Sequence, residues 1–162
     1  MELQIVVDPL TGPEIAALLR EHLDEMYRIS PPESVHALDL AKLRQADVTF
    51  WSAWAGGELL GCAALRELDG RHGEIKSMRT GAAHRGRGVA GALMRRILGE
   101  AEQREYRRLS LETGSQPEFA PARALYRRYG FEVCGPFADY AEDPCSTFMT
   151  RTLAGAHNRN QR

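Results

Sequence analysis

The segment His84–Gly91, with the sequence HRGRGVAG, concentrates the residues best suited to binding an anion. Its glycines allow sharp turns and let the backbone come close to a ligand. The periodic apolar stretch that follows predicts a helix, whose unpaired amides and positive dipole end would face this loop. Arg85 and Arg87 add positive charge. Together these features predict a phosphate or pyrophosphate site, the alternative being a plain glycine-rich turn with solvated arginines.

The same glycines also match another phosphate-binding pattern. Gly86, Gly88 and Gly91 fit the dinucleotide fingerprint GxGxxG, and Glu112 lies 21 residues beyond Gly91, near the place of that fold's ribose-binding acid. However, residues 81–85 separate the preceding strand from the first glycine, and too little chain follows Glu112 to form a second half-sheet. A nucleotide-binding, Rossmann-like protein therefore remains only as an alternative. A Walker A loop is excluded because no Gly-Lys-Ser/Thr follows.

The elements that must position this loop are read from hydrophobic periodicity and turn residues. The first helix is expected to begin at Thr11 as its N-cap, with Pro13 in the first turn and Glu14 completing a capping box. Gly130 is expected to end the last helix. We expect strands at 3–7, 48–55, 58–68, 74–80, 108–113, 131–134 and 146–153, and helices between 11 and 30, at 35–44, from 88 to about 103 and at 118–129. This order predicts an α/β fold with a mixed, mostly antiparallel sheet flanked by helices and a single β-α-β crossover over residues 74–113.

Length and composition bound the class of protein. The 162 residues suit one domain, expected over 1–154 with a polar tail at 155–162, and the net charge of −1 argues against a nucleic-acid partner. The chain has no apolar run long enough to span a membrane and no signal-peptide pattern. Three cysteines without a CxxC motif and five scattered histidines predict reduced thiols, no metal and a cytoplasmic protein. Exposed strand edges would allow a homodimer.

Two segments resemble sequence motifs of the GNAT superfamily of N-acetyltransferases. Arg85-x-x-Gly88-x-Ala90 resembles motif A, R/Q-x-x-G-x-G/A, and residues 122–131 (ARALYRRYGF) resemble the A-x-x-L-Y-x-x-x-G-F motif that follows the next strand. Within the superfamily, the YsnE-like group of N-acetyltransferases is similar at residues 30–38, 111–115 and 135–149. The resemblance implies acetyl-CoA as the donor and an amine of a small molecule as the acceptor. A GNAT fold that binds acyl-CoA without turnover is the other alternative.

The resemblance also implies how acetyl-CoA is held. In relatives, the strand matching 74–80 carries a bulge and splays from its parallel neighbour, here 109–112, and the gap admits the pantetheine arm. A backbone N–H on the first of these strands polarises the thioester carbonyl. The expected acetyl-CoA-binding residues are Met78, Arg79, Thr80, Arg85, Gly86, Arg87, Gly88, Val89 and Ala90. Phe119 stands near the place where many relatives have an Asn that contacts CoA.

Proton transfer requires an acid and a base. Tyr126 is the expected acid, because a phenol with a pKa of about 10 is protonated at neutral pH and can protonate the leaving thiolate. Its alternatives are ordinary packing of Tyr126, or Tyr129 as the acid. Glu74 is the expected general base, although it could equally be a solvated carboxylate at a strand end. Glu112 and Asp139 are further candidates for the base.

The acceptor site is expected to form from residues 26–38 and 138–146. Negative charge there would suit a cationic amine, or could simply be solvated surface. The acidic candidates are Glu33, Asp139, Glu142 and Asp143, with His36 and Tyr140 as candidate lining residues.

Overall fold

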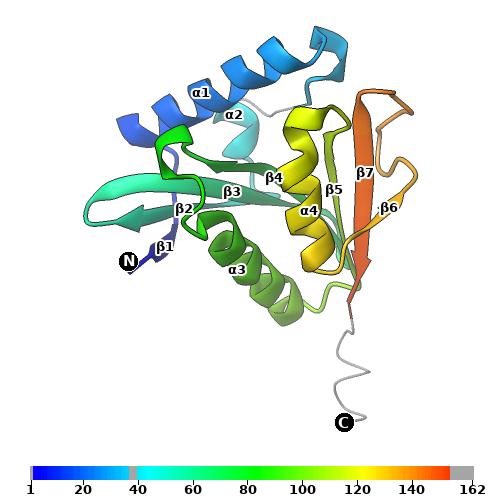
Figure 1. Ribbon diagram of the computed structural model, residues 1–162. Coiled ribbons are helices and arrows are strands. Elements are labelled where there is room, and N and C mark those ends of the chain that lie inside the picture. The colour runs from blue at the N-terminus through cyan, green and yellow to red at the C-terminus, as the bar shows by residue number, and fades with distance from the viewer. Residues whose placement is uncertain (1, 37–39, 154–162) are drawn as a thin grey trace.

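Seven strands form one sheet in the order β1-β2-β3-β4-β5-β7-β6 in the computed structural model, which describes residues 2–36 and 40–153 (Figure 1). Neighbouring strands run antiparallel except for β4 and β5, which are parallel and connected through α3. The expected mixed sheet with one crossover is therefore confirmed. In the described part of the chain, no helix has the length and apolar character needed to cross a membrane.

Most of the predicted elements are present, with boundaries that shift by one or two residues. The strands are β1 (Gln4–Val7), β2 (Val48–Ala55), β3 (Glu58–Asp69), β4 (His72–Thr80), β5 (Arg108–Gly114), β6 (Glu132–Cys134) and β7 (Ser146–Thr152). The helices are α1 (Pro13–Ile29), α2 (Leu40–Leu43), α3 (Val89–Gln103) and α4 (Ala120–Arg128), with 3₁₀ turns η1 (Pro32–Ser34), η2 (Ala82–His84) and η3 (Pro117–Phe119). The expected tail at 155–162 lies outside the described residues.

The start of α1 differs from the prediction. The N-cap is Gly12, in extended conformation and without a side-chain cap, so the assignment of Thr11 as N-cap was wrong. Pro13 does occupy the first turn, as expected. The preceding turn is closed instead by Asp8, whose Oδ1 accepts a 2.7 Å hydrogen bond from the amide of Leu10. Leu10 is buried with φ of 64°, so the turn is held by packing of its side chain as well.

Among the described residues, only the last part of the segment predicted as one helix over 35–44 is helical. The turn η1 precedes it, α2 covers only its last part, and residues 37–39 lie outside the described residues.

At the other end of the chain, Gly130 follows α4 with φ of 88°, the left-handed conformation that a helix-terminating glycine supplies at little cost. The predicted end of that helix is therefore confirmed.

Different helices cover the two faces of the sheet (Figure 1). Strand β3 shows why, because its side chains alternate between two clusters: Ala63 and Leu65 face one, Cys62 and Ala64 the other. The first cluster contains the apolar stripe of α3 and Tyr126 of α4. The second contains the buried residues of α1 and α2, namely Ile15, Leu18 and Leu43. The sheet is thus held between α3 and α4 on one side and α1 and α2 on the other.

The parallel strands β4 and β5 separate halfway along their length. They pair over His72–Ile75 and Arg108–Leu111, and no further pair follows. Beyond Ile75, β4 stays with β3 through a β-bulge, where Ser77 has φ of 54° and the register shifts between Cys62 and Ala64. Strand β5 continues along β7. One edge of the outer half of β4 therefore lacks a strand partner among the described residues, which confirms the expected bulge and splay.

The single parallel pair rules out the Rossmann-like alternative, since that fold needs an open, mostly parallel sheet.

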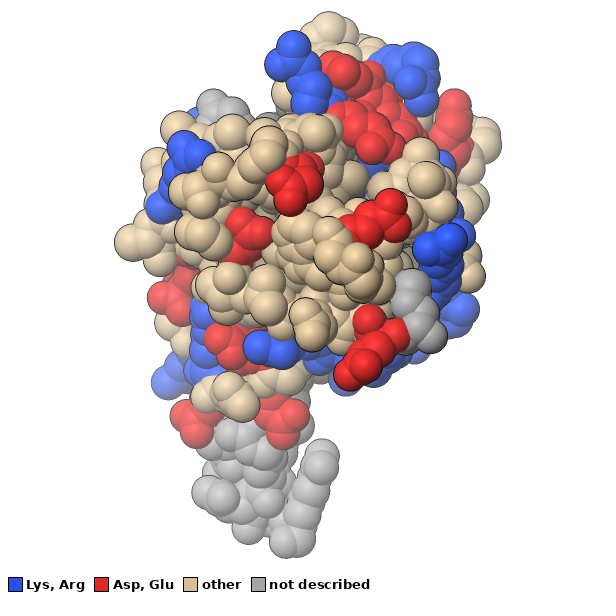
Figure 2. All heavy atoms as spheres, turned by 90° about the vertical axis from the view of Figure 1, so that its left-hand side faces the viewer, with Lys and Arg blue, Asp and Glu red and all other residues tan. Residues whose placement is uncertain are grey.

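The two edges of the observed sheet are the short strands β1 and β6. Val7 on β1 and Val133 on β6 are 62% and 60% exposed. A second copy of the chain would pair at such an edge, and the homodimer remains a prediction. On the face seen in Figure 2, Lys and Arg side chains are interspersed with Asp and Glu.

Candidate functional site

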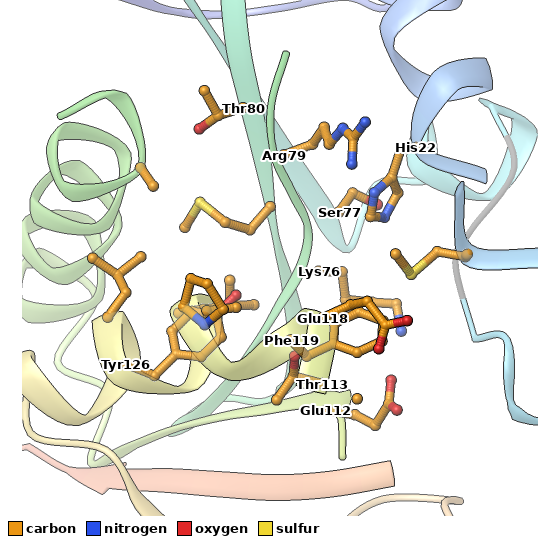
Figure 3. A pocket seen from close by; sticks show the side chains of 18 of the residues that line it. His22, Lys76, Ser77, Arg79, Thr80, Glu112, Thr113, Glu118, Phe119 and Tyr126 are labelled. Atoms are coloured by element: carbon orange, nitrogen blue, oxygen red, sulfur yellow. The ribbon is translucent and has the colours of Figure 1, made fainter. Parts of the chain in front are cut away.

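A cavity of about 560 Å³ lies where β4 and β5 part (Figure 3). Its walls come from α1, β4, the start of α3, the end of β5, α4 and the connection between β6 and β7. One end of the cavity is formed by the glycine-rich loop and the other by buried ionisable side chains. The splay of the sheet therefore creates the space, and helices from both faces enclose it.

The loop before α3 has the geometry of an anion site. Gly86 and Gly88 have φ of 80° and 79°, and a Cβ built at either would meet nothing within 4 Å. Glycine is needed there for its backbone conformation, and the space above it remains open for a ligand. The first backbone bond of α3 is from Ala92 N–H to Gly88 O, and no side chain caps the helix, so the amides of Val89–Gly91 have no protein partner among the described residues. These groups fit a diphosphate.

Most residues expected to bind acetyl-CoA line this cavity. Those that do are Met78, Arg79, Thr80, Arg85, Gly86, Gly88, Val89 and Ala90. Arg87 is not among the lining residues, and its exposed guanidinium lies 3.5 Å from Nδ1 of His84. Sequence spacing could not separate the two arginines, because the direction of a side chain in a loop depends on the local backbone conformation.

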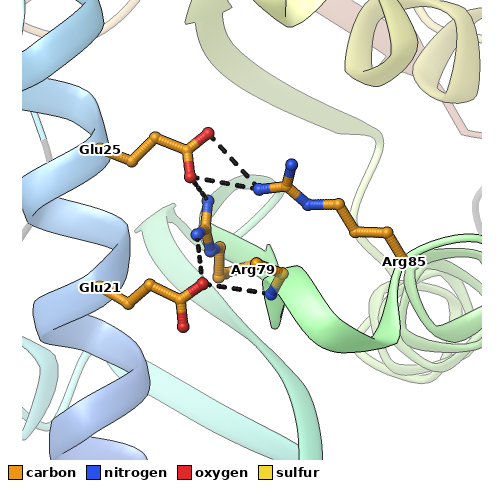
Figure 4. Close-up of polar contacts among 5 residues, drawn as sticks. Glu21, Glu25, Arg79 and Arg85 are labelled. Atoms are coloured by element: carbon orange, nitrogen blue, oxygen red, sulfur yellow. Dashed lines mark hydrogen bonds and ion pairs between the residues drawn. The ribbon is translucent and has the colours of Figure 1, made fainter.

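The side chain of Arg79 is held by two carboxylates of α1 (Figure 4). It is 6% exposed and forms ion pairs with Glu21 at 2.7 Å and Glu25 at 2.6 Å, both on α1. Arg85 also reaches Glu25, at 3.2 Å. Burial raises the pKa of Glu25, but the hydrogen bond and charge of Arg79 outweigh burial and hold the pKa below its ordinary value. Arg79 therefore ties α1 to the bulged strand through both terminal nitrogens of its guanidinium, while its Nε is buried without a hydrogen-bond partner.

Tyr126 lies on α4 with 7% of its surface exposed, and it lines the cavity. Its hydroxyl makes no hydrogen bond within the described residues. Burial raises the pKa of Tyr126 to about 12, and the nearby charge of Glu112 adds to this, so the phenol stays protonated. The competing Tyr129 accepts a 2.9 Å hydrogen bond from Arg95 and does not line the cavity. Of the two phenols, the geometry favours Tyr126 as a proton donor.

Glu74, Lys76 and Tyr140 form a buried polar cluster at the other end of the cavity. The Tyr140 hydroxyl donates to Oε2 of Glu74 at 2.5 Å, and Lys76 Nζ donates to the Tyr140 hydroxyl at 2.7 Å and to the same Glu74 oxygen at 3.3 Å. The side chains of Glu74 and Lys76 are only 1% and 8% exposed. Glu74 is therefore not a solvated carboxylate at a strand end, and its Oε1 is buried without a hydrogen-bond partner.

Glu112 lies on β5, immediately beyond the last parallel pair, where its side chain lines the cavity (Figure 3). Burial raises the pKa of Glu112 to about 7, while the charge of Lys76 opposes the shift. A carboxyl group with this pKa can take up and release a proton near neutral pH. Among the further candidates for the base, Glu112 lines the cavity, whereas Asp139 is exposed and does not.

The titratable residues of the cavity that sequence reasoning missed include His22 and Lys76. Burial lowers the pKa of His22 to about 4, helped by the positive charge of Arg79, so its imidazole is neutral at pH 7. His22 carried no signal beyond its place on an amphipathic helix. For Lys76 the signal was a charged residue within a strand otherwise expected to be buried. That signal was ambiguous, because a charged residue also occurs in a strand at the edge of a sheet.

The acceptor wall forms from the two expected segments, but not from the expected acids. From these segments the cavity is lined by Met26, Ile29, Ser30, Ser34, Val35, His36, Tyr140 and Cys145. None of the four acidic candidates lines it, which corrects the prediction: Glu33, Asp139 and Glu142 are exposed, and Asp143 accepts a 2.6 Å hydrogen bond from Ser34. The carboxylates that do line the cavity are Glu25, Glu74, Glu112 and Glu118.

Phe119, near the place where the resemblance implies an Asn, lines the cavity. Its ring packs directly on Gly114, where an added Cβ would lie 2.1 Å from a ring carbon. Gly114 is thus required by the close approach of the aromatic ring. The ring presents an apolar surface at this point of the wall.

A bulged and splayed strand pair beside an amide-lined helix start defines a domain of the acyltransferase type. Residues 15–131 match the model of the Acetyltransferase (GNAT) family, and the chain belongs to that family. It is 59% identical over 151 residues to the uncharacterized N-acetyltransferase YsnE of Bacillus subtilis (strain 168), covering 93% of this chain and 100% of that protein. Identity to the uncharacterized N-acetyltransferase YedL of Escherichia coli (strain K12) is 51% over 149 residues, covering 92% and 94%.

One solved structure with the same fold contains acetyl-CoA. This GNAT family acetyltransferase from Elizabethkingia anophelis, with acetyl-CoA bound, superposes with a TM-score of 0.68 at 20% identity over 93% of this chain and 98% of that one. The GNAT fold is thus one that binds acetyl-CoA, and the chain is an acyltransferase. Within the described residues, no group of three or more His, Cys, Asp or Glu side chains is placed to hold a metal ion.

Proposed function

We propose that this protein transfers the acetyl group of acetyl-CoA to the amine of a small molecule. One observation carries the proposal: a single cavity joins the free amides at the start of α3, the unpaired edge of β4 and a buried set of proton-exchanging side chains. A phosphate-binding start, a strand edge for the pantetheine amides and an enclosed acid–base end are the three parts that acetyl transfer requires.

Binding would use backbone groups along the length of the cavity. The amides of Val89–Gly91 would receive the diphosphate, with Arg85 nearby as a positive charge. The free edge of β4 would pair with the pantetheine arm. A backbone N–H in the stretch Met78–Thr80 would donate to the thioester oxygen and stabilise negative charge that develops there during attack.

The proton transfers would use three side chains at the closed end. Glu74 would accept a hydrogen bond from the amine through its free Oε1, and Glu112 would take the proton that the nitrogen loses. A C–N bond forms, the C–S bond breaks, and Tyr126 gives its proton to the leaving sulfur. This assigns the role of base to Glu112 and makes Glu74 a group that binds the amine, because Oε2 of Glu74 is already committed to Tyr140 and Lys76.

The experiment has two parts. Acetyl-CoA should raise the melting temperature of the protein by mass action, whereas NADH should leave it unchanged. An amine library with acetyl-CoA should then give release of free thiol that depends on both the amine and the enzyme. Stabilisation by NADH but not by acetyl-CoA would contradict the assignment of the phosphate site, and absence of thiol release across the library would contradict the transfer.

A further inference from the structure

The closed end of the cavity contains two buried charged groups that still have room for a partner. Glu74 Oε1 is an acceptor without a donor, on a side chain that is 1% exposed. Lys76 has three N–H donors, of which two are directed to Tyr140 and to Oε2 of Glu74. The cluster therefore leaves one acceptor and one donor to be satisfied by a ligand.

A simple amine would satisfy only half of this arrangement. Its ammonium would donate to Glu74, while the remaining N–H of Lys76 would stay without an acceptor, and a buried donor without a partner is costly. The two other strand and loop cations of the cavity, Arg79 and Arg85, are already paired with carboxylates of α1. Lys76 is therefore the cation positioned to receive an anionic group of the acceptor at this end.

We propose that the acceptor is an amino acid or a close analogue, with its amine on Glu74 and its carboxylate on Lys76. This inference rests on the proposed function and specifies its substrate class. The side chain of the acceptor would meet the rings of His36 and Tyr140, which lie edge to face at 5.0 Å, together with Ile29 and Val35. Burial, with the charge of Lys76, lowers the pKa of His36, so this wall is uncharged at neutral pH and suits an apolar or aromatic side chain.

The reaction then balances without any further reactant. The amino acid enters as its ammonium form, loses one proton to Glu112 and attacks the acetyl carbon through the free nitrogen. The sulfur leaves with a proton from Tyr126, the nitrogen of the tetrahedral intermediate loses its second proton and thereby restores the Tyr126 hydroxyl, and Glu112 releases the first proton to solvent. The net products are an N-acetylamino acid, free CoA thiol and one proton, and the carboxylate stays on Lys76 throughout.

Matched pairs of acceptors test the inference through thiol release. L-phenylalanine against 2-phenylethylamine, and L-leucine against 3-methylbutylamine, differ only in the carboxylate. In the wild type, kcat/KM should be about 10- to 100-fold higher for each amino acid, the range expected for one hydrogen bond between charged groups. Lys76→Gln should remove that preference, Lys76→Arg should keep part of it, and acetyl-CoA should raise the melting temperature of both variants. Equal or better use of the decarboxylated amines would overturn the inference.

A second readout does not depend on turnover. The chain contains two lysines, Lys42 and Lys76, so protein made with 13Cε-lysine gives two sets of NMR signals, which Lys42→Arg assigns. In the presence of CoA, L-phenylalanine should shift the Lys76 signal and leave Lys42 unchanged, while 2-phenylethylamine should not move Lys76. If neither amino acid shifts Lys76 or releases thiol while acetyl-CoA still stabilises the fold, the substrate class is wrong and the donor site stands. If acetyl-CoA does not bind, the proposed function fails and the inference with it.

Discussion

Replacing Glu112 with Gln should make the protein more stable at pH 8. Burial holds the pKa of this carboxyl at about 7 in the folded protein, against its ordinary value of 4.5. Below pH 4.5 the group is protonated in both folded and unfolded chains, so it costs nothing. Above pH 7 it is ionised in both, and the folded state bears the whole penalty, which for this gap is about 3 kcal/mol. Stability from this group is therefore lost as pH rises from 4.5 to 7.

Glu112→Gln removes the penalty because glutamine has no charge to bury. Thermal melts should show a gain of up to about 3 kcal/mol at pH 8, or roughly 6–12 °C for a domain of this size, shrinking to nothing at pH 4. Glu118→Gln is the matched control, since Glu118 lines the same cavity but is exposed, and its effect should stay within about 0.5 kcal/mol. A Glu112→Gln protein that is less stable at pH 8, or equally stabilised at pH 4 and pH 8, would refute the reasoning.

Glu112→Gln should lower the activity of the enzyme, although it raises the stability of the fold. In the wild type, kcat/KM should rise with pH through about 7 as Glu112 becomes ionised and able to act as a base. Glu112→Gln should lower kcat/KM by about 100-fold and flatten that rise. An unchanged profile in the variant would move the base elsewhere, while leaving the stability prediction to be judged separately.

The remaining predictions concern Tyr126, Gly88 at the N-cap of α3, Gly99 within α3, and Arg79. Tyr126→Phe should lower kcat by about 100-fold without weakening acetyl-CoA binding, whereas Tyr129→Phe should keep kcat; equal turnover in the two variants would remove Tyr126 from proton transfer. Gly88→Ala should cost about 1–2 kcal/mol because its φ is 79°, and it should weaken acetyl-CoA binding, as melts with and without the ligand would show. Gly99→Ala, on the exposed face of the same helix with open space around it, should instead gain about 0.5–1 kcal/mol. Arg79→Leu should cost about 2–4 kcal/mol in urea unfolding, since two partly buried carboxylates lose their partner; a loss below 1 kcal/mol would mean that solvent screens the network.

Local patterns predicted most of the elements because they depend on neighbouring residues alone. The strand patterns at 48–55 and 58–68 and the apolar stripe of α3 are local features, and these elements appear at the predicted places. The anion site at Gly86 and Gly88 was predictable for the same reason, since a loop and the helix after it are built from one short segment. The cap at Thr11 was wrong because Asp8 closes the preceding turn, which residue preferences at the helix start do not reveal.

The acceptor site was predicted only as two segments, because exposure of a loop side chain depends on what packs against it. The acidic residues Glu33, Asp139 and Glu142 read as a binding patch, yet they face solvent. The carboxylates that do enter the cavity come from strands and helices, and include Glu74 and Glu112.

The sequence by itself determined the order of elements, the glycine-dependent loop and the family, because each rests on short-range spacing. Only the tertiary structure decided the hydrogen-bond partners and the pKa values of the ionisable groups. The hydroxyl of Tyr140 meets Glu74 across 66 positions of sequence, and the same packing leaves one oxygen of Glu74 without a donor. The pKa of Glu112 reaches about 7 because its side chain is buried where strands β4 and β5 separate. Desolvation depends on every neighbour at once, so it appears only when the chain is folded.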